Sequence, residues 1–238
     1  IGLYQHFVDS KAFTPEVCVA FLAACLEHAR YLDAALKSQP QGNNWRLMEA
    51  EGLGAIALCF PEFKGAKAWR ERSFAVLKDN LRRQVRSDGM HFEQCFNYHE
   101  GCVAWFARTA QLAKMNGQGE DFGPAYFATI EAMCDVLLKM SFPDGTTPQF
   151  GDGHTQESVL GTLREWAGFF KRDDFRYAAS GGKEGRVPSD TATALKESGF
   201  YSLRSGWDGK ATCLAMSRRG ASSLPTSRCA KTSKWAHT

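Results

Sequence analysis

Apolar side chains recur every three or four positions through most of the first 172 residues, a spacing typical of helices that bury one face. The first long helix is predicted to start at Thr14 and Pro15, because threonine is a good N-cap and proline suits the first helical position. Five more helices are predicted between turn residues, at about 43–60, 61–87, 97–115, 124–140 and 157–171. Most of the chain is therefore predicted to be all-α.

Two Asp-Gly turns, at Asp88 and Asp144, lie 56 residues apart, and each is followed by a phenylalanine, Phe92 or Phe150. This distance is about the length of two helices with their loops, which indicates a repeated helical hairpin. Repeated hairpins of this size predict an α-toroid or a solenoid.

The pattern changes after the glycine-rich segment 181–185, which is predicted to belong to a polar linker. Apolar and polar residues alternate over 200–205, a turn signal follows at 207–210, and 211–216 is a plausible returning strand. Since an isolated hairpin is marginal in water, we expect these strands to open a larger antiparallel β-domain.

The chain is thus predicted to divide into a helical domain, a linker, the first strands of a β-domain and a disordered tail, at 1–180, 181–197, 198–217 and 218–238. The tail holds five basic residues and no acidic one. The rest of the chain has 24 basic and 26 acidic residues, a net charge of −2, so a nucleic-acid-binding surface is not expected. No stretch approaches the apolar length of a membrane span.

The eight cysteines form no C-x-x-C pair, which disfavours a zinc site and predicts free thiols packed as small apolar residues. The chain starts at Ile1 and does not begin with a basic segment followed by an apolar one, so a signal peptide is not expected within it.

Three clusters of polar residues could carry chemistry. The first is Asn43-Asn44-Trp45, just before a predicted helix. Its asparagines either cap that helix or offer a neutral amide at the positive helix end, where a carboxylate is favoured. The aromatic side chain of Trp45 could stack on a sugar ring or pack in the core.

The second cluster places His91, Glu93, Tyr98 and His99 within nine residues at a loop-to-helix junction. These groups suit acid–base catalysis, although a chance gathering of polar loop residues, or a core tyrosine, gives the same pattern.

The third cluster is the segment 150–154, which contains Asp152 and His154. It is either a turn closed by an Asx hydrogen bond or a substrate-contacting loop on the same rim as the second cluster. Its spacing does not match a calcium-binding loop.

The order of these motifs resembles the heparinase II/III family of polysaccharide lyases, above all its heparinase III-type branch, which is similar to alginate lyases of the same architecture. The resemblance covers about residues 1–217 and is carried by segments 43–50, 52–53, 60–63, 88–89, 92–93 and 98–99. It implies an incomplete (α/α) toroid followed by a large antiparallel β-sandwich domain, of which this chain holds the first strands.

The resemblance also implies β-elimination on a uronic acid: the carboxylate is neutralised, the C5 proton is removed, and the leaving glycosidic oxygen is protonated. Asn44 would neutralise the carboxylate, helped by Glu93 if that side chain is protonated, and Tyr98 would be the acid, or the base for some stereochemistries. An ordinary phenol is a poor base near pH 7, so His99 is assigned either a supporting positive charge or a positioning role.

The resemblance further implies an acidic polysaccharide substrate, no cofactor for the chemistry, and a periplasmic or secreted protein; it leaves open the oligomeric state and a structural metal in the β-domain. Arg46 would meet sulfate or carboxylate groups. The remaining residues assigned to substrate binding are Asn43, Trp45, Glu49, His91, Asp152 and His154.

One departure from the family pattern concerns the β-domain, where a further histidine is expected soon after the strands at 199–217. Here the chain continues as Arg-Arg-Gly-Ala-Ser-Ser from Arg218, and His237 lacks the family's motif. We therefore expect a truncated β-domain, half of the cleft missing, and weak or absent turnover by the isolated chain.

Two other functions fit the residues. A glycoside hydrolase on a similar toroid could use Asp88 with Glu93, or Asp152, as acid and base. A non-catalytic sugar-binding module is the other alternative. A lyase product contains a conjugated double bond and takes up no water, which separates the first two functions.

Overall fold

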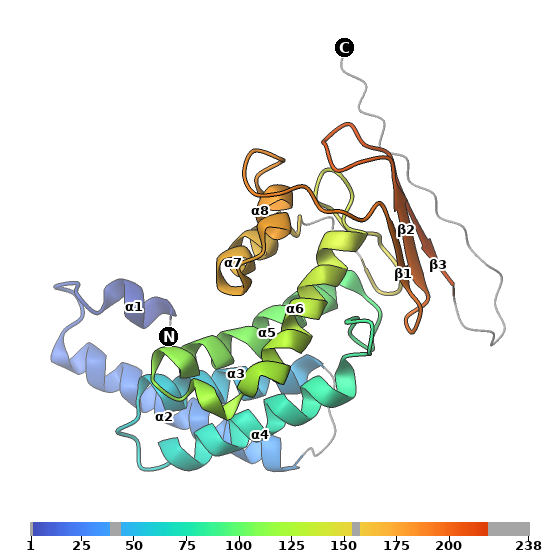
Figure 1. The fold of residues 1–238 in the computed structure, drawn as a ribbon. Coiled ribbons are helices and arrows are strands. Elements are labelled where there is room, and N and C mark those ends of the chain that lie inside the picture. Colours follow the sequence, from blue (N-terminus) through green and yellow to red (C-terminus); the bar gives the residue numbers. More distant parts are fainter. Residues whose placement is uncertain (1, 39–43, 154–157, 219–238) are drawn as a thin grey trace. The chain divides into compact units, whose positions relative to one another are not determined.

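The computed structural model describes residues 2–38, 44–153 and 158–218, and it is mostly helical with a small sheet near its C-terminal end (Figure 1). The helices are α1 Gly2–Phe7, α2 Pro15–Ser38, α3 Asn44–Cys59, α4 Ala66–Gln84, α5 Phe96–Met115, the 3₁₀ helix η1 Gly119–Asp121, α6 Gly123–Met140, α7 Leu160–Phe170 and α8 Asp173–Ala179. The strands are β1 Ala192–Leu195, β2 Phe200–Arg204 and β3 Cys213–Ser217. This confirms a mainly all-α chain followed by antiparallel strands; the toroid stays a prediction.

All six predicted helices form, with two shifted starts. Residues 61–65 make turns rather than the first turn of α4, since the Phe63 N–H bonds to the Phe60 carbonyl and the Ala66 N–H to the Phe63 carbonyl. The sixth helix, α7, starts at Leu160 rather than near residue 157. Asn43, His154 and the predicted tail from residue 219 onward lie outside the described residues.

The short elements α1, η1, α8 and β1 were not predicted from the sequence. Strand β1 falls inside the predicted linker, so the irregular segment between helix and sheet is shorter than expected. Its Ala-Thr-Ala-Leu sequence has little alternation of its own, and the strand is defined by antiparallel pairing with β2.

The chain divides into two compact units, whose borders fall within α4, α5 and α6. The first unit comprises residues 1–82 and 104–127, the second residues 83–103 and 128–238. Within the first unit α3 is buried on several sides, and the Ser73 hydroxyl of α4 donates a 2.6 Å hydrogen bond to the Ala50 carbonyl of α3. Gly54 faces Ser73 and Thr109 so closely that a Cβ would collide with both side chains.

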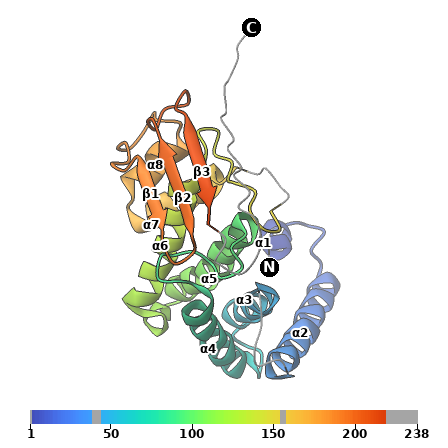
Figure 2. The same ribbon diagram turned by 90° about the vertical axis from the view of Figure 1, so that its right-hand side faces the viewer.

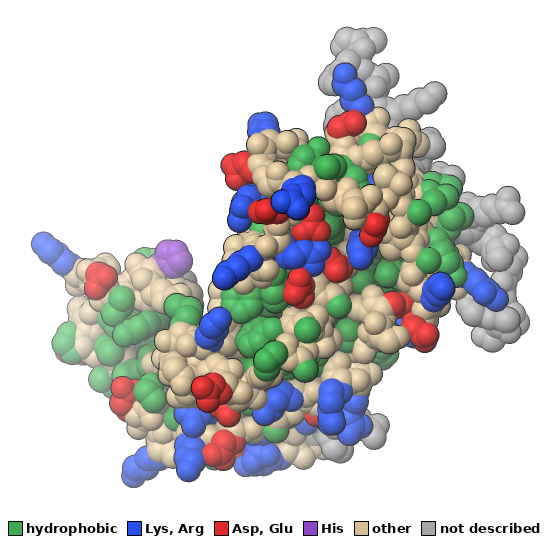
Figure 3. Space-filling model, viewed as in Figure 1, with side chains coloured by type: hydrophobic (Ala, Val, Ile, Leu, Met, Phe, Trp, Pro, Cys, Tyr) green, Lys and Arg blue, Asp and Glu red, His purple; other side chains and the backbone are tan. Residues whose placement is uncertain are grey.

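Six aromatic side chains pack against one another in the N-terminal part of the first unit. They are Tyr4, Phe13, Phe21, Phe60, Phe63 and Trp69. Beside them lies an apolar pocket of about 230 Å³ lined by residues of α1, α2 and the segment between them, where hydrophobic side chains gather at the surface (Figure 3).

In the second unit the sheet has the order β1-β2-β3, and all its pairs are antiparallel (Figure 2). One face is buried through Phe200, Ala215 and neighbours, whereas Leu203 and Met216 are exposed on the other. The buried face completes a core with α5 and α6 that contains Met90, Phe96, Val136, Met140, Leu195, Phe200 and Ala215.

Two side chains of β2 also bond to the carboxyl end of α6. The Ser202 hydroxyl donates to the Lys139 carbonyl at 2.8 Å, and the Arg204 guanidinium donates to the Ser141 carbonyl at 2.7 Å. Because the last carbonyls of a helix lack partners within it, these bonds attach the sheet firmly to α6. The start of α5, which bears Tyr98 and His99 of the second predicted cluster, therefore packs against a well-packed core.

Candidate active site

The second cluster lies on a tight hairpin that follows α4. The chain reverses at Gly89, whose φ of 85° suits glycine, and a Cβ there would lie 2.5 Å from the Ala132 carbonyl oxygen of α6. The Phe92 N–H then donates to the Gln84 carbonyl at 2.7 Å, and Val85 pairs with His91 as an isolated bridge. The hairpin thereby brings His91 back beside the end of α4.

His91 is completely buried. Its Nε2 lies 3.1 Å from the Gln84 side-chain oxygen, so this nitrogen carries the proton and donates. Its Nδ1 has no hydrogen-bond partner among the described residues. Burial, with a smaller contribution from His99, lowers the pKa of His91 to about 3. This geometry favours a structural role over the predicted contact with substrate, because the ring does not reach the surface.

His99 is buried as well, and both of its ring nitrogens are engaged. The backbone N–H of His91 donates to Nδ1 of His99 at 3.1 Å. Nε2 of His99 therefore carries the proton and donates to the Met133 carbonyl at 2.9 Å. Burial lowers the pKa of His99 to about 4, although the Met133 bond and the Asp88 charge oppose that shift. The ring is neutral near pH 7, which removes the predicted supporting positive charge and favours the positioning role.

Tyr98 lies in the first turn of α5, and in the sequence it stands between two residues whose side chains face the core. Phe96 and His99 are both buried, whereas Tyr98 is only half-buried. Glu93 is half-buried in the loop before the helix. Tyr98 and Glu93 are thus the members of the second cluster that reach the surface of the unit.

The third cluster lies next to the second, as expected for a shared rim. The Phe150 ring stacks on Phe200 with centroids 5.3 Å apart, which fixes one end of the loop to the core. A Cβ added to Gly151 would lie 3.6 Å from the Gln94 carbonyl oxygen, and one added to Gly153 would lie 3.4 Å from the Asn97 side-chain oxygen. The exposed Asp152 is therefore presented beside the N-terminal end of α5.

The first cluster belongs to the first unit. Asn44 starts α3 and is buried, whereas Trp45 next to it is 72% exposed. Glu49 is half-buried one helical turn after Trp45, on the same side of α3. An exposed tryptophan with a carboxylate beside it can offer a sugar both a stacking face and a hydrogen-bond acceptor.

Arg46 differs from the prediction. Its side chain is buried, and its guanidinium donates to the Leu36 carbonyl near the end of α2 at 3.1 Å. Burial lowers the pKa of Arg46, against the opposing charges of Glu49 and Asp79. This bond satisfies a carbonyl at a helix end, and it favours a link between α2 and α3 over the predicted contact with sulfate.

The structure therefore brings together five of the predicted site residues in the second unit, namely His91, Glu93, Tyr98, His99 and Asp152. Asn44, Trp45, Arg46 and Glu49 lie in the first unit, and the meeting of the two groups around one substrate stays a prediction.

Sequence reasoning missed Gln84 and Ser198 as partners of the site loop. Gln84 binds His91, and Ser198 binds Asp88 and Gln94. The Asp-Gly pair at 88–89 signalled a turn, but no local signal could show that a residue 110 positions later contacts it.

Among the described residues, no three His, Cys, Asp or Glu side chains gather closely enough to hold a metal ion. Seven cysteines lie in the described part and all are free thiols, as predicted; four of them are buried, namely Cys95, Cys102, Cys134 and Cys213. No helix in the described ranges has both the length and the apolar character needed to cross a bilayer.

Comparisons with known proteins agree with this architecture. The family model Heparinase II/III N-terminus matches residues 1–177. A heparin-sulfate lyase of Pedobacter heparinus is 35% identical over 216 residues, which cover 90% of this chain and 32% of that protein. A heparin-sulfate lyase of Bacteroides thetaiotaomicron is 28% identical over 233 residues, which cover 91% of this chain and 33% of that protein.

Two solved structures are similar in fold as well. A heparan sulfate lyase mutant from Pedobacter heparinus has a TM-score of 0.76 at 34% identity, with 90% of this chain and 34% of that chain covered. A heparinase III structure has a TM-score of 0.78 at 26% identity, with 91% of this chain and 35% of that chain covered. The chain spans about a third of the length of these relatives. Since the family model covers about three quarters of its residues, the chain belongs to the heparinase II/III family.

Proposed function

We propose that the chain is the helical part, with the first strands, of a polysaccharide lyase that cleaves a uronic-acid-containing glycan of the heparan sulfate type by β-elimination. Relatives at 28% to 35% identity are named heparin-sulfate lyases. The observation that carries the proposal is the placement of Tyr98. His91 and His99 are both buried, and each is held by a hydrogen bond from its Nε2, so Tyr98 and Glu93 are the acid–base groups of the cluster that reach the surface. Of these two, the half-buried phenol of Tyr98 is proposed to transfer the proton.

In the proposed reaction the C5 proton of the uronate leaves, the bond between C4 and the glycosidic oxygen breaks, and a double bond forms between C4 and C5. When the C5 proton and the leaving oxygen lie on the same face of the ring, the ionised Tyr98 oxygen accepts the C5 proton and passes it to the leaving oxygen. When they lie on opposite faces, Tyr98 donates its hydroxyl proton to the leaving oxygen, and the C5 proton passes to a second base, the histidine that the family pattern places in the β-domain.

Asn44 is proposed to neutralise the substrate carboxylate. It lies at the N-terminal end of α3, where backbone N–H groups and the helix dipole also favour an anion. Neutralising the carboxylate makes the neighbouring C5 hydrogen more acidic, which is the energetic requirement of the elimination. Trp45 is proposed to stack on a sugar ring, and Glu49 and Asp152 to bind its hydroxyl groups.

The hydrolase alternative is less favoured, because the Asp88 carboxylate is already occupied. It accepts hydrogen bonds from the Ser198 N–H, the Ser198 hydroxyl and the Met90 N–H. A general acid needs to approach the glycosidic oxygen, and a carboxylate held by three bonds within the fold is poorly placed for that.

Product analysis tests the proposal. A chain that carries a complete C-terminal β-domain is incubated with heparan sulfate, heparin, hyaluronan and alginate, and ultraviolet absorbance and product masses are recorded. Elimination predicts a new absorbing double bond and fragment masses that sum to the mass of the polymer segment. Products that each contain an added water molecule would identify a hydrolase, and binding without cleavage would favour a sugar-binding module.

We also propose that the protein acts in the periplasm or outside the cell, since an intact glycan polymer is met there. Cell fractionation with an antibody against the chain tests this, and recovery from the cytoplasm alone would contradict it.

A further inference from the structure

The turn between β1 and β2 contacts the hairpin that precedes the candidate catalytic helix. The Ser198 N–H donates to Asp88 Oδ2 at 2.8 Å, and the Ser198 hydroxyl donates to Asp88 Oδ1 at 2.9 Å. The Met90 N–H donates to the same Oδ1 at 3.2 Å. One carboxylate therefore joins two segments that lie 110 positions apart in the chain.

Two further hydrogen bonds run in the opposite direction. The Gln94 side-chain amide donates to the Ser198 carbonyl at 2.8 Å, and the Arg86 guanidinium donates to the Glu197 carbonyl at 2.9 Å. The N–H, carbonyl and hydroxyl of Ser198 are thus all bonded to the hairpin, and Ser198 is 4% exposed. Because Ser198 is buried, loss of these bonds is costly, since its polar groups would be left without water or a partner.

Gln94 shows why the hairpin needs this support. Its φ of 56° lies in the left-handed region, which a residue with a Cβ rarely adopts and which costs of the order of 1 kcal/mol. Gln94 lies next to Glu93 and two residues before α5, so its backbone conformation sets the direction in which the chain enters that helix. Its bond to Ser198 and the bond from its N–H to the His91 carbonyl at 3.0 Å hold the conformation.

We propose that Ser198 and Asp88 are positioning residues for the lyase: the β1–β2 turn clasps the 86–94 hairpin and thereby sets the orientation of Glu93 and Tyr98. The inference rests on the proposed function. According to this proposal, the turn between the first two strands helps to orient α5. Neither residue touches substrate, so their loss should lower the rate of the chemical step while substrate binding is retained.

The main variant is Asp88→Asn, which keeps the size of the side chain but replaces one acceptor oxygen by an amide donor that cannot accept the Ser198 bond. Asp144→Asn is the matched control, since Asp144 begins the other Asp-Gly turn and accepts bonds from the N–H and hydroxyl of Thr146, two residues away. Ser198→Ala removes only the hydroxyl, and Ser198→Thr restores it. These milder variants serve if Asp88→Asn fails to fold.

The first readout is hydrogen–deuterium exchange, which does not depend on activity. We expect amides of residues 88–98 and 196–200 to exchange at least tenfold faster in Asp88→Asn than in the wild-type chain, and to be unchanged in Asp144→Asn. Unchanged exchange in both Asp88→Asn and Ser198→Ala would overturn the clasp.

The second readout is kinetic. We expect Asp88→Asn to lower kcat about tenfold or more with KM within twofold, Ser198→Ala to lower kcat less, and Ser198→Thr to recover it. Faster exchange with unchanged kcat would overturn the positioning role. A wild-type protein that carries a complete β-domain and still lacks lyase activity would instead contradict the proposed function, and exchange alone would still decide whether the clasp holds the hairpin.

Discussion

The backbone N–H of His91 donates a hydrogen bond to Nδ1 of His99 at 3.1 Å, and this bond determines the proton positions on the His99 ring. A ring nitrogen that accepts carries no proton, so Nε2 must carry it, and it donates to the Met133 carbonyl of α6. His99 is therefore a neutral link between the site hairpin, α5 and α6. Protonation of Nδ1 would break the first of these bonds.

The first prediction follows from this neutrality and concerns acid stability. The folded pKa values of His99 and His91 are about 4 and about 3, below the ordinary value of 6.5 that applies when the chain unfolds. The unfolded state then binds more protons below pH 6.5, so stability falls as the pH falls. His99 alone should cost about 3 kcal/mol between pH 6.5 and pH 4.

Urea unfolding measured at intervals from pH 7.5 to pH 4 checks this prediction. His99→Gln should be less stable at pH 7.5 and should show a flatter decline with acid. His28→Gln is the control, since that histidine is exposed and bonds to the Ala24 carbonyl in its own helix. Equal acid slopes in all three proteins would contradict the assignment of a buried neutral His99.

Replacing Tyr98 by phenylalanine tests its role in proton transfer. Tyr98→Phe should lower kcat by about 10² to 10⁴, the range typical of losing a general acid or base, with little change in Tm. Tyr31→Phe, at a side chain 72% exposed, is the matched control and should leave the rate unchanged. Elimination at the wild-type rate in Tyr98→Phe would remove this phenol from the mechanism.

Two substitutions at Asn44 separate capping from carboxylate neutralisation. Asn44→Ala should lower kcat/KM on uronates by about 10², which corresponds to about 3 kcal/mol for a lost donor to developing negative charge. Asn44→Asp keeps a good capping side chain but adds a charge that repels the substrate carboxylate.

The proposed role therefore predicts low activity for both variants, with Tm nearly unchanged in Asn44→Asp. A purely structural cap predicts the opposite: Asn44→Asp is active, and Asn44→Ala loses about 1 kcal/mol of stability only. Thermal unfolding and steady-state kinetics of the two proteins distinguish the outcomes.

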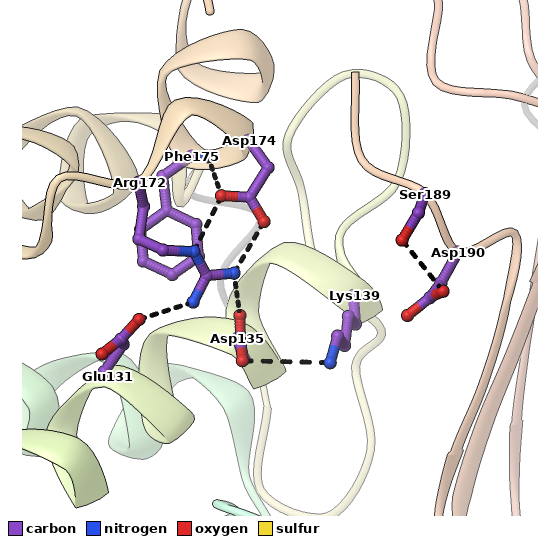
Figure 4. Close-up of polar contacts among 8 residues, drawn as sticks. All are labelled: Glu131, Asp135, Lys139, Arg172, Asp174, Phe175, Ser189 and Asp190. Carbon is purple, nitrogen blue, oxygen red and sulfur yellow. Dashed lines mark hydrogen bonds and ion pairs between the residues drawn. The ribbon is translucent and has the colours of Figure 1, made fainter. Parts of the chain in front are cut away.

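Arg172 is the centre of an ion-pair network that joins α6 to the start of α8 (Figure 4). Its guanidinium bonds to Glu131, Asp135 and Asp174 at 2.6 to 2.8 Å and lies 4.2 Å from the centre of the Phe175 ring. Burial raises the pKa of Asp174, but the hydrogen bond to Arg172, the charge of Arg172 and the backbone hydrogen bonds to the carboxylate together outweigh burial and bring the pKa below its ordinary value.

Arg172→Met should lower the free energy of unfolding by about 2 kcal/mol, because three partly buried carboxylates lose their common partner. Arg176→Met is the control: its pair with Asp173 is about half exposed, and such pairs contribute less than about 1 kcal/mol. Chemical denaturation measures both values. A loss in Arg172→Met no larger than that of the control would show that the network adds little to stability.

The helical part of the fold could be predicted from the sequence, because each long helix carries its own apolar spacing and lies between turn residues. Thr14 and Pro15 mark the start of α2 in both the sequence and the structure. Strand β1 could not be predicted, since its four residues gain their hydrogen bonds only by pairing with β2.

The candidate site could be predicted as a cluster of residues, but the sequence did not show which of them are buried and which are accessible. His91, Tyr98 and His99 are close in the sequence, yet spacing alone does not show which of them faces the core. Packing against α6 and the end of α4 buried both histidines and left Tyr98 partly accessible. The same argument applies to Arg46. The sequence predicts that its guanidinium contacts a sulfate group, whereas in the fold the guanidinium donates to the Leu36 carbonyl.

By itself, the sequence determined the helical periodicity, the turns at Asp88 and Asp144, the antiparallel hairpin of β2 and β3, and the order of motifs that indicates the family. These features are local, because each depends on residues a few positions apart. Only the tertiary structure decided that His99 is neutral and that Ser198 holds the site hairpin. Burial, and hydrogen bonds between distant segments, depend on which parts of the chain pack together, and no short stretch of sequence encodes that.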